Sequence, residues 1–212
     1  MSAASESSLA RRRLLLALPV LLSGCAAMLP AQPVITSGGP PIYRDSLALT
    51  GRISVRYQQN GKDESLQGGF EWSQAPGTIT LSLLSPLNQI LARIEVTPDA
   101  ARLFEAGKPP RTAPDIDALM MQTFGWTLPV TGMRGWLQGF DLDGGRPLPI
   151  AIPGAADAPP VATRDGWKIG YVSWQNETEP PLTRPRRIDL ERTTPELGLM
   201  AIRIVINTWQ AL

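Results

Sequence analysis

The residue types that carry out most enzymatic chemistry are scarce in this chain. It contains no histidine and a single cysteine, Cys25. Without histidine it lacks the commonest general base and a frequent metal ligand. No Gly-x-Ser-x-Gly nucleophile motif is present, and Gly107-Lys108 lacks the earlier glycine and the following Ser or Thr of a phosphate-binding loop. The sequence therefore gives no positive indication of a catalytic, metal or nucleotide site.

Two pairs of carboxylates remain, Asp115 with Asp117 and Asp141 with Asp143. Glycosidases use two carboxylates that face one another across the substrate. Residues two apart on a helix do not face each other. We interpret the first pair as charges at the start of a helix and the second pair as loop residues. We therefore predict a protein that is not an enzyme and that holds no metal.

Cys25 lies at the end of an N-terminal export signal. Arg11-Arg12-Arg13 precedes an apolar run that ends in Leu22-Ser23-Gly24-Cys25. A basic segment, an apolar segment and small residues at a cleavage site are typical of a secretory signal peptide. The run has about half of the 20 residues that a membrane-spanning helix needs. We predict that residues 1–24 are a signal peptide, and the three arginines leave both the Sec and the twin-arginine export routes open.

The four residues Leu22–Cys25 resemble the lipobox of bacterial lipoproteins. That resemblance implies that Cys25 carries S-diacylglycerol and N-acyl groups and becomes the first residue of the mature chain. An ordinary signal peptide with an incidental cysteine is the alternative. No cofactor is predicted apart from these covalent lipids.

The rest of the chain divides into a tether and one domain. Residues 25–43 are rich in Pro and Gly and have no periodicity, which predicts a flexible tether. Residues 44–212 are predicted to form a single domain. The net charge of the chain is +1, which argues against nucleic-acid binding, because that function requires a strongly basic face.

Alternating apolar and polar residues predict an antiparallel β-meander in the first half of the domain. From Leu47 to Tyr57, apolar residues or glycine occupy every second position, and Asn60-Gly61 is a strong hairpin signal before the next strand. Further strands are predicted over residues 66–72, 78–84, 90–96 and 100–104. Strands of this kind have one apolar and one polar face.

The apolar period changes to that of a helix in the middle of the domain. Apolar residues at 116, 119, 120 and 124 predict a helix with Asp115 near its start and Gly125 as its C-terminal stop. A second short helix is predicted, with Thr131 as its cap and Gly139 at its end. Residues 141–160 and 179–185 are predicted loops, and residues 167–173, 187–190 and 199–205 are predicted strands. The order of strands, two helices and further strands indicates an α+β fold, with the helices on one side of a curved sheet.

Apolar side chains on the predicted strands and helices allow two interpretations. They form either a packed core or the wall of a cavity for acyl chains, which adaptable Met side chains would suit. Periodicity does not separate the two. The candidates for the cavity wall are Phe70, Trp72, Leu119, Met120, Phe124, Met133, Trp136 and Leu137.

Ser85-Pro86-Leu87-Asn88 is predicted to form the tip of a hairpin, because Pro sets φ for a turn and Asn tolerates a left-handed backbone. A leucine at such a tip is exposed to water. A single exposed leucine is common, but one that is buried in lipid gains about 1.5–3 kcal/mol. Pro86 and Leu87 are therefore the candidates for a loop that inserts into a membrane.

Several short motifs follow one another in order along the domain. They are Leu49-Thr50-Gly51-Arg52-Ile53-Ser54-Val55, Phe70-Glu71-Trp72, Leu83–Leu87, Gly125–Val130, Trp136–Gly139, Gly166–Tyr171 and Ile204–Trp209. Each motif is weak alone. Together with the lipobox, the ordered set resembles the LolB family of outer-membrane lipoproteins over about residues 47–209.

This resemblance implies an incomplete, half-open antiparallel β-barrel whose short helices form a lid over an apolar cavity. It implies a receptor that accepts lipoproteins from the soluble periplasmic carrier LolA, holds their acyl chains, and inserts them into the inner leaflet of the outer membrane without nucleotide hydrolysis. The protein is then a lipid-anchored monomer that faces the periplasm. Leu87 takes the place of the family's protruding-loop leucine and Cys25 that of the acylated cysteine. Ala26, where an Asp would favour the inner membrane, fits sorting to the outer membrane.

Two features depart from the family pattern. Asn88 stands where the family often has Gly, and we expect the turn to be preserved because Asn also tolerates a left-handed backbone. Residues 42–46 leave little room for the family's helix before the first strand. Two other functions stay open, a passive scaffold lipoprotein of the envelope and an envelope hydrolase, although the missing histidine and nucleophile motifs disfavour the hydrolase.

Overall fold

The computed structural model describes residues 42–59, 61–141, 148, 159–178, 181–195 and 197–212. The predicted signal peptide, Cys25 and all but the last two residues of the predicted tether lie outside this part of the chain. The described elements all belong to one compact unit, Val34–Leu212. Residues 42–46 are not helical, and the first strand begins directly after them.

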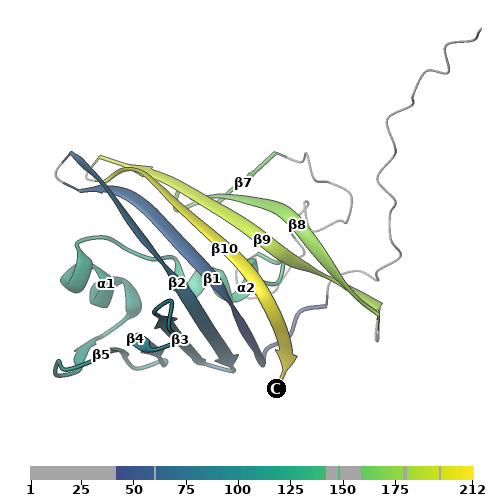
Figure 1. Ribbon diagram of the computed structural model, residues 1–212, viewed down its shortest axis with the longest axis horizontal. Coiled ribbons are helices and arrows are strands. Elements are labelled where there is room, and N and C mark those ends of the chain that lie inside the picture. Colours follow the sequence, from purple (N-terminus) through teal and green to yellow (C-terminus); the bar gives the residue numbers. More distant parts are fainter. Residues whose placement is uncertain (1–41, 60, 142–147, 149–158, 179–180, 196) are drawn as a thin grey trace, which may run out of the picture. The chain divides into compact units, whose positions relative to one another are not determined.

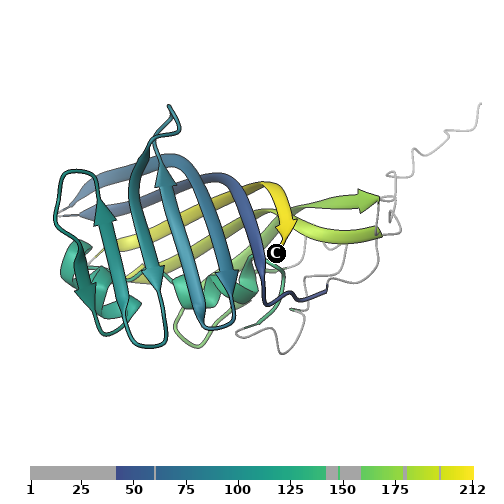
Figure 2. The ribbon, with the colours of Figure 1, turned by 90° about the horizontal axis from the view of Figure 1, so that it is seen from below.

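One ten-stranded sheet makes up most of this unit, and its neighbouring strands pair antiparallel. The strands are β1 (Leu47–Gln59), β2 (Lys62–Ala75), β3 (Thr78–Leu84), β4 (Ile90–Val96), β5 (Ala101–Glu105), β6 (Arg111–Ala113), β7 (Val161–Ala162), β8 (Lys168–Thr178), β9 (Pro181–Thr194) and β10 (Gly198–Ala211). Their order across the sheet is β6-β5-β4-β3-β2-β1-β10-β9-β8-β7. β6 and β7 are its edges, so the sheet curves without closing (Figures 1 and 2). The predicted α+β class and unclosed antiparallel sheet are confirmed.

Two strands extend further than the sequence pattern predicts. β2 begins at Lys62 rather than at residue 66, because its first residues continue the β1–β2 ladder as far as the Gln59–Lys62 pair. Six residues at the start of β2 are exposed, so they lack the alternation that a half-buried strand shows.

The predicted loop over residues 181–185 is wrong, because β9 begins at Pro181. Proline is tolerated as the first residue of a strand and beside a bulge. Pro181 is the first residue of β9, and Pro185 pairs with Trp174 next to a shift in register. β6 and β7 were not expected from the sequence, since strands of three and two residues are too short to show an alternating pattern.

The core lies against the inner, concave face of the sheet. Residues at alternate positions of the strands are buried there, and their neighbours on the outer face are polar or charged. The buried strand residues include Leu49, Ile53, Val55, Phe70, Trp72, Leu81, Ile94, Leu103, Ile169, Ile188, Ile202 and Ile204. An apolar sheet face is usually buried against a second sheet or inside a closed barrel. Here the inner face of an open sheet is buried in another way.

The two described helices lie on that inner side. α1 (Ile116–Phe124) begins after Asp115, whose carboxylate accepts a hydrogen bond of 2.7 Å from the Ala118 N–H, and ends at Gly125 with φ of 75°. Both predicted boundaries are confirmed. α2 (Val130–Trp136) is preceded by Pro129 and has no side-chain cap, so the predicted cap at Thr131 is wrong. Gly139 follows the helix with φ of 84°.

The two helices are attached to the sheet in different ways. α2 is held by polar contacts: Arg134 donates to a β2 carbonyl at 2.9 Å, Gln138 exchanges hydrogen bonds with the Arg44 backbone, and the Tyr171 hydroxyl donates to the Trp136 carbonyl at 2.6 Å. α1 rests on β5 and β6 through apolar side chains. Within the described residues, a single side-chain hydrogen bond of 3.4 Å joins the segment around α1 to a strand.

Gly51 is required by close packing at the centre of the sheet. It lies at a register shift between β1 and β10, and a Cβ atom there would overlap the Val205 carbonyl oxygen and crowd the Phe70 ring. Neither neighbour can move easily, because one is backbone and the other is in the core.

We predict that Gly51→Ala lowers the free energy of unfolding by about 1–3 kcal/mol, the usual cost of overpacking a core. Gly170→Ala is the matched control, since a Cβ atom at that strand position meets its nearest atom, the Asp189 carbonyl oxygen, at an ordinary 3.7 Å. Urea denaturation of both variants measures the difference. Equal stability of the two variants would contradict the packing argument.

Candidate functional site

The loop between β3 and β4 has a defined shape although it is exposed. The Ser85 hydroxyl accepts hydrogen bonds from the Leu87 and Gln89 N–H groups, both at 3.2 Å, and the Asn88 N–H donates to the Ser85 carbonyl at 2.9 Å. Asn88 has φ of 59°, the left-handed conformation that the sequence predicts. These bonds fix the turn without any contribution from the Leu87 side chain.

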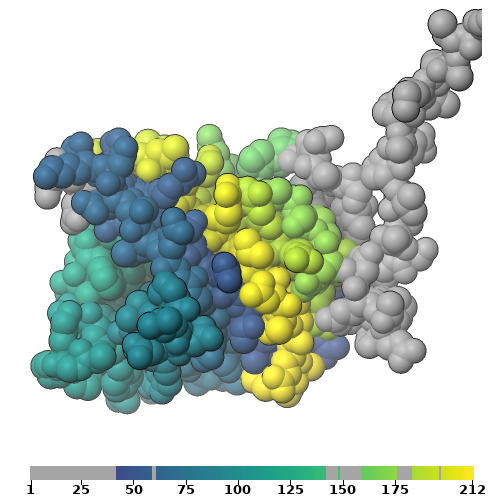
Figure 3. All heavy atoms as spheres, in the orientation of Figure 1, coloured from purple at the N-terminus to yellow at the C-terminus, as the bar shows by residue number. Residues whose placement is uncertain are grey.

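Leu87 stands at the tip of this loop with 81% of its surface exposed, the largest exposure among the described large apolar residues. The loop extends beyond the neighbouring strand ends in Figure 2, and in Figure 3 its atoms stand out from the outer face of the sheet. A rigid turn therefore presents one apolar side chain to the solvent. The predicted exposure of Leu87 is confirmed.

A second feature is an apolar cavity of about 160 Å³ between the inner face of the sheet and α1. It is lined by Ile53, Val55, Leu66, Gln67, Gly68, Gly69, Leu83, Leu84, Leu91, Ala92, Ile94, Leu103, Met120, Phe124, Trp126 and Leu128. Leu66 and Leu91 are half exposed and Phe124 is 37% exposed, so apolar side chains also mark its mouth. None of these described lining residues is charged.

The structure places the eight sequence candidates for the cavity wall in two groups. Met120 and Phe124 line the apolar cavity. Phe70, Trp72, Leu119, Met133, Trp136 and Leu137 are nearly inaccessible and belong to the packed core. None of these six side chains lines the apolar cavity.

Sequence reasoning missed most of the residues that line the cavity. Trp126 is the largest of them, and its ring contacts Tyr57 and Phe124 at centroid distances of 5.7 and 5.9 Å. Val55 and Leu66 carry the alternation that places them on the inner face, which was the available signal. The helical period alone does not tell which strand residues α1 leaves uncovered.

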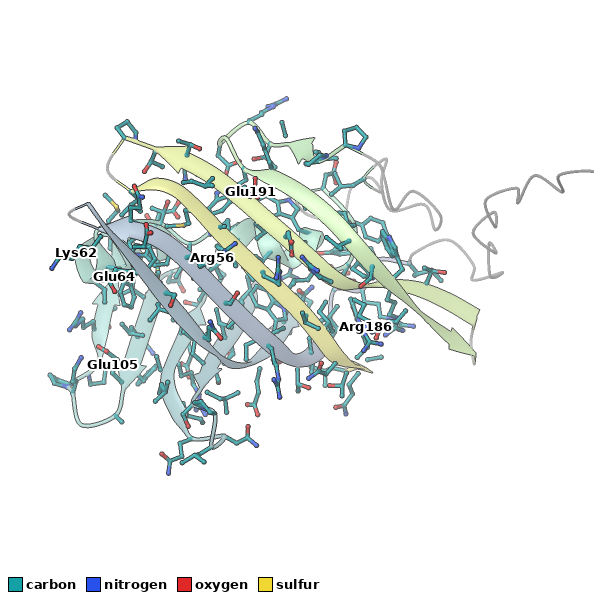
Figure 4. All side chains as sticks on the ribbon, turned by 45° about the horizontal axis from the view of Figure 1, so that its top comes forward. Arg56, Lys62, Glu64, Glu105, Arg186 and Glu191 are labelled. Carbon is teal, nitrogen blue, oxygen red and sulfur yellow. The ribbon has the colours of Figure 1, made fainter. Side chains whose placement is uncertain are left out.

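Charged side chains lie mainly on the opposite, outer face, where Arg56, Arg186 and Glu191 project away from the core (Figure 4). On that face Asp189 accepts hydrogen bonds from Arg187 and Arg203. Burial raises the pKa of this carboxyl, but the two guanidinium groups outweigh that effect and hold it below its usual range. Asp189, Arg187 and Arg203 therefore form a structural cluster of ion pairs rather than a reaction centre.

The described residues contain no group of three or more His, Cys, Asp or Glu side chains that could hold a metal ion. None of the described helices is long and apolar enough to cross a membrane.

Comparison with known proteins identifies the family. The profile of the family described as "Outer membrane lipoprotein LolB" matches residues 45–209, which include the described strands and helices except the last two residues of β10. The chain belongs to the LolB family.

Sequence similarity to curated LolB proteins extends over nearly the whole chain. "Outer-membrane lipoprotein LolB" of Cupriavidus pinatubonensis is 40% identical over 206 residues, 95% of this chain and 96% of that protein. The LolB of Cupriavidus metallidurans is 38% identical over 92% of this chain and 93% of its own. The LolB of Ralstonia nicotianae is 33% identical over 88% and 90%.

Among solved structures, a LolA superfamily protein from Nitrosomonas europaea aligns with 81% of this chain and 88% of its own, at 10% identity and a TM-score of 0.44. A likeness at that level is too low to carry an argument. LolB membership thus rests on the sequence comparisons, and it makes the chain an outer-membrane lipoprotein by family.

Phe124→Glu is predicted to weaken binding of a neutral apolar fluorophore such as Nile red by about tenfold or more, because it places a charge at the mouth of the apolar cavity. Phe124 is partly exposed, so the fold is expected to survive the change. Leu199→Glu is the control, an exposed apolar residue on the outer face of β10. Unchanged fluorophore binding by Phe124→Glu would show that this cavity does not admit apolar ligands.

Proposed function

We propose that this protein is the receptor that takes lipoproteins from the periplasmic carrier LolA and inserts them into the inner leaflet of the outer membrane. The LolB family match over residues 45–209 carries the proposal. The apolar cavity and the exposed tip at Leu87 support it, because they offer one site for an acyl chain and one for a bilayer.

Transfer in this proposal needs no nucleotide. Each methylene that leaves water contributes about 0.8 kcal/mol, so a long acyl chain cannot pass through the solvent at a useful rate. It must move from the carrier's cavity directly to this one. A difference of about 1.4 kcal/mol between two apolar sites already gives a tenfold bias, and the bilayer is the final and more favourable site.

The cavity is smaller than most ligand sites, so the proposal requires movement. Pockets that bind small molecules usually hold ~300–1,000 Å³, whereas this cavity holds about 160 Å³. We assign the role of a lid to α1 and the segment that follows it. Apolar contacts and one long hydrogen bond attach this segment, whereas α2 is tied to the sheet by several polar contacts.

Membrane attachment is assigned to the N-terminal part of the chain. In this proposal residues 1–24 are removed, the acylated Cys25 anchors the protein, and residues 25–43 tether a monomeric domain of residues 44–212. A lipid anchor raises the local concentration of the domain at the membrane. Pro86 and Leu87 then contact the bilayer during release, with a gain of about 1.5–3 kcal/mol for a buried leucine, which is too little to anchor a protein.

Transfer between purified proteins tests the proposal. A soluble form that lacks residues 1–25 is mixed with an acylated lipoprotein held on LolA, without ATP, and the position of the cargo is followed. Movement of the cargo to this protein is expected. If the cargo stays on LolA while circular dichroism shows a folded domain, the passive scaffold becomes the better interpretation.

For Leu87→Glu we predict normal uptake of cargo from the carrier and at least a tenfold slower delivery to liposomes. The change leaves the cavity intact and removes the apolar contact of the tip with the bilayer. Leu87→Met, which keeps an apolar tip, is expected to deliver normally. Normal delivery by Leu87→Glu would remove the tip from the mechanism.

A further inference from the structure

A second hollow also has Trp126 in its lining. It holds about 320 Å³ and opens between the end of α1 and the ends of β9 and β10. Its lining is Met121, Gly125, Trp126, Thr127, Trp167, Arg192, Thr194, Leu197 and Met200. Trp126 lines both spaces, so the two hollows share this residue in their walls.

Among the described residues that line this hollow, Arg192 alone is charged, and it lies on the inner face of the sheet, where its neighbours are apolar. Ile188 and Leu190, at the preceding alternate positions of β9, are 1% exposed and point into the core. Arg192 pairs with the buried Met200 of β10 and continues that inner row. Its neighbour Glu191 projects from the outer face (Figure 4).

The contacts of Arg192 with other described residues use few of its N–H donors. The guanidinium lies 5.8 Å from the centre of the Trp167 ring and donates to the Thr127 hydroxyl at 3.4 Å. No carboxylate of the described residues lies within ion-pair distance of it. A guanidinium has five N–H donors, and polar groups inside an apolar site are costly unless they are paired.

The surroundings favour a ligand that joins a hydrogen-bond acceptor to hydrocarbon. The side chains that line the hollow around Arg192 are mainly apolar or aromatic, which suits the hydrocarbon part of a ligand.

We infer that this hollow binds the polar junction of an acylated ligand, and that Arg192 donates hydrogen bonds to its ester or amide carbonyl oxygens while the chains enter the apolar space. The inference rests on the proposed function, which makes an acylated cysteine the cargo. Ester carbonyls beside acyl chains also occur in phospholipids, so the shared chemistry has two sources. Arg192 is a positioning residue in either case, because it fixes where the chains begin.

Arg192→Met tests the inference, with Arg192→Lys as the conservative variant. Arg186→Met is the matched control, an exposed arginine on the outer face of the same strand. Each variant is titrated with a tripalmitoylated cysteinyl peptide, with a short-chain diacyl phosphatidylcholine below its micelle concentration, and with the carbonyl-free hydrocarbon fluorophore diphenylhexatriene. Urea denaturation confirms that each variant is folded.

Arg192→Met is expected to bind the lipopeptide about tenfold more weakly than the wild-type protein and the hydrocarbon fluorophore equally well. The lipopeptide affinity of Arg192→Lys is expected to lie between those of the wild-type protein and Arg192→Met. Arg186→Met is expected to bind both ligands like the wild-type protein. A parallel loss for the phosphatidylcholine would assign the contact to shared ester carbonyls, and a loss limited to the lipopeptide would assign it to the acylated cysteine. Equal losses for lipopeptide and fluorophore, or no loss, would overturn the inference. Failure of the wild-type protein to bind the lipopeptide would instead count against the proposed function.

Discussion

The concave face of an unclosed sheet is the constraint on which the rest of this structure depends. Ten antiparallel strands curve around an apolar interior, but β6 and β7 remain separate edges. The inner face must therefore be covered by something other than the sheet itself. Two short helices and the segment between them do this, and they cover it unevenly, which leaves two hollows that are both lined by Trp126.

The unequal attachment of the two helices follows from where polar groups lie along the chain. Arg134 and Gln138 lie in or just after α2 and meet backbone groups of β2 and of residues near the start of the domain. α1 has apolar residues toward the sheet and its own capping interactions at both ends. The domain thus has, on the same face, one helix held by polar contacts and one held mainly by apolar contacts.

Sequence periodicity predicted the elements whose residues alternate between core and solvent. Asp115 and Gly125 identified both ends of α1, and Ser85 to Asn88 identified the turn that exposes Leu87. The β8–β9 hairpin was harder to predict, because Pro181 and Pro185 are typical of loops. Whether a strand tolerates such prolines depends on how it pairs with its partner strand. β6 was too short to give a pattern.

The candidate site was predictable only in part, for a physical reason. The helical period showed that Met120 and Met133 face inward, but a buried face can pack tightly or leave space. Met120 borders the apolar cavity and Met133 is in the packed core, a difference set by how each helix is placed on the strands. The row Ile188, Leu190, Arg192 did contain a usable signal, a charge at an inward position of a strand.

The apolar attachment of α1 has a consequence for temperature. When an acyl chain enters the cavity in the proposed transfer, apolar contacts between α1 and the sheet are replaced by apolar contacts with the chain. The free-energy change of this exchange is therefore close to zero. Hydrophobic association weakens on cooling. Cooling therefore weakens both the contacts of α1 with the sheet and the contacts of the bound acyl chain with the cavity. In the proposed transfer, loading past this helix should therefore depend less on temperature than either contact would alone, which suits a transfer proposed to run without nucleotide hydrolysis.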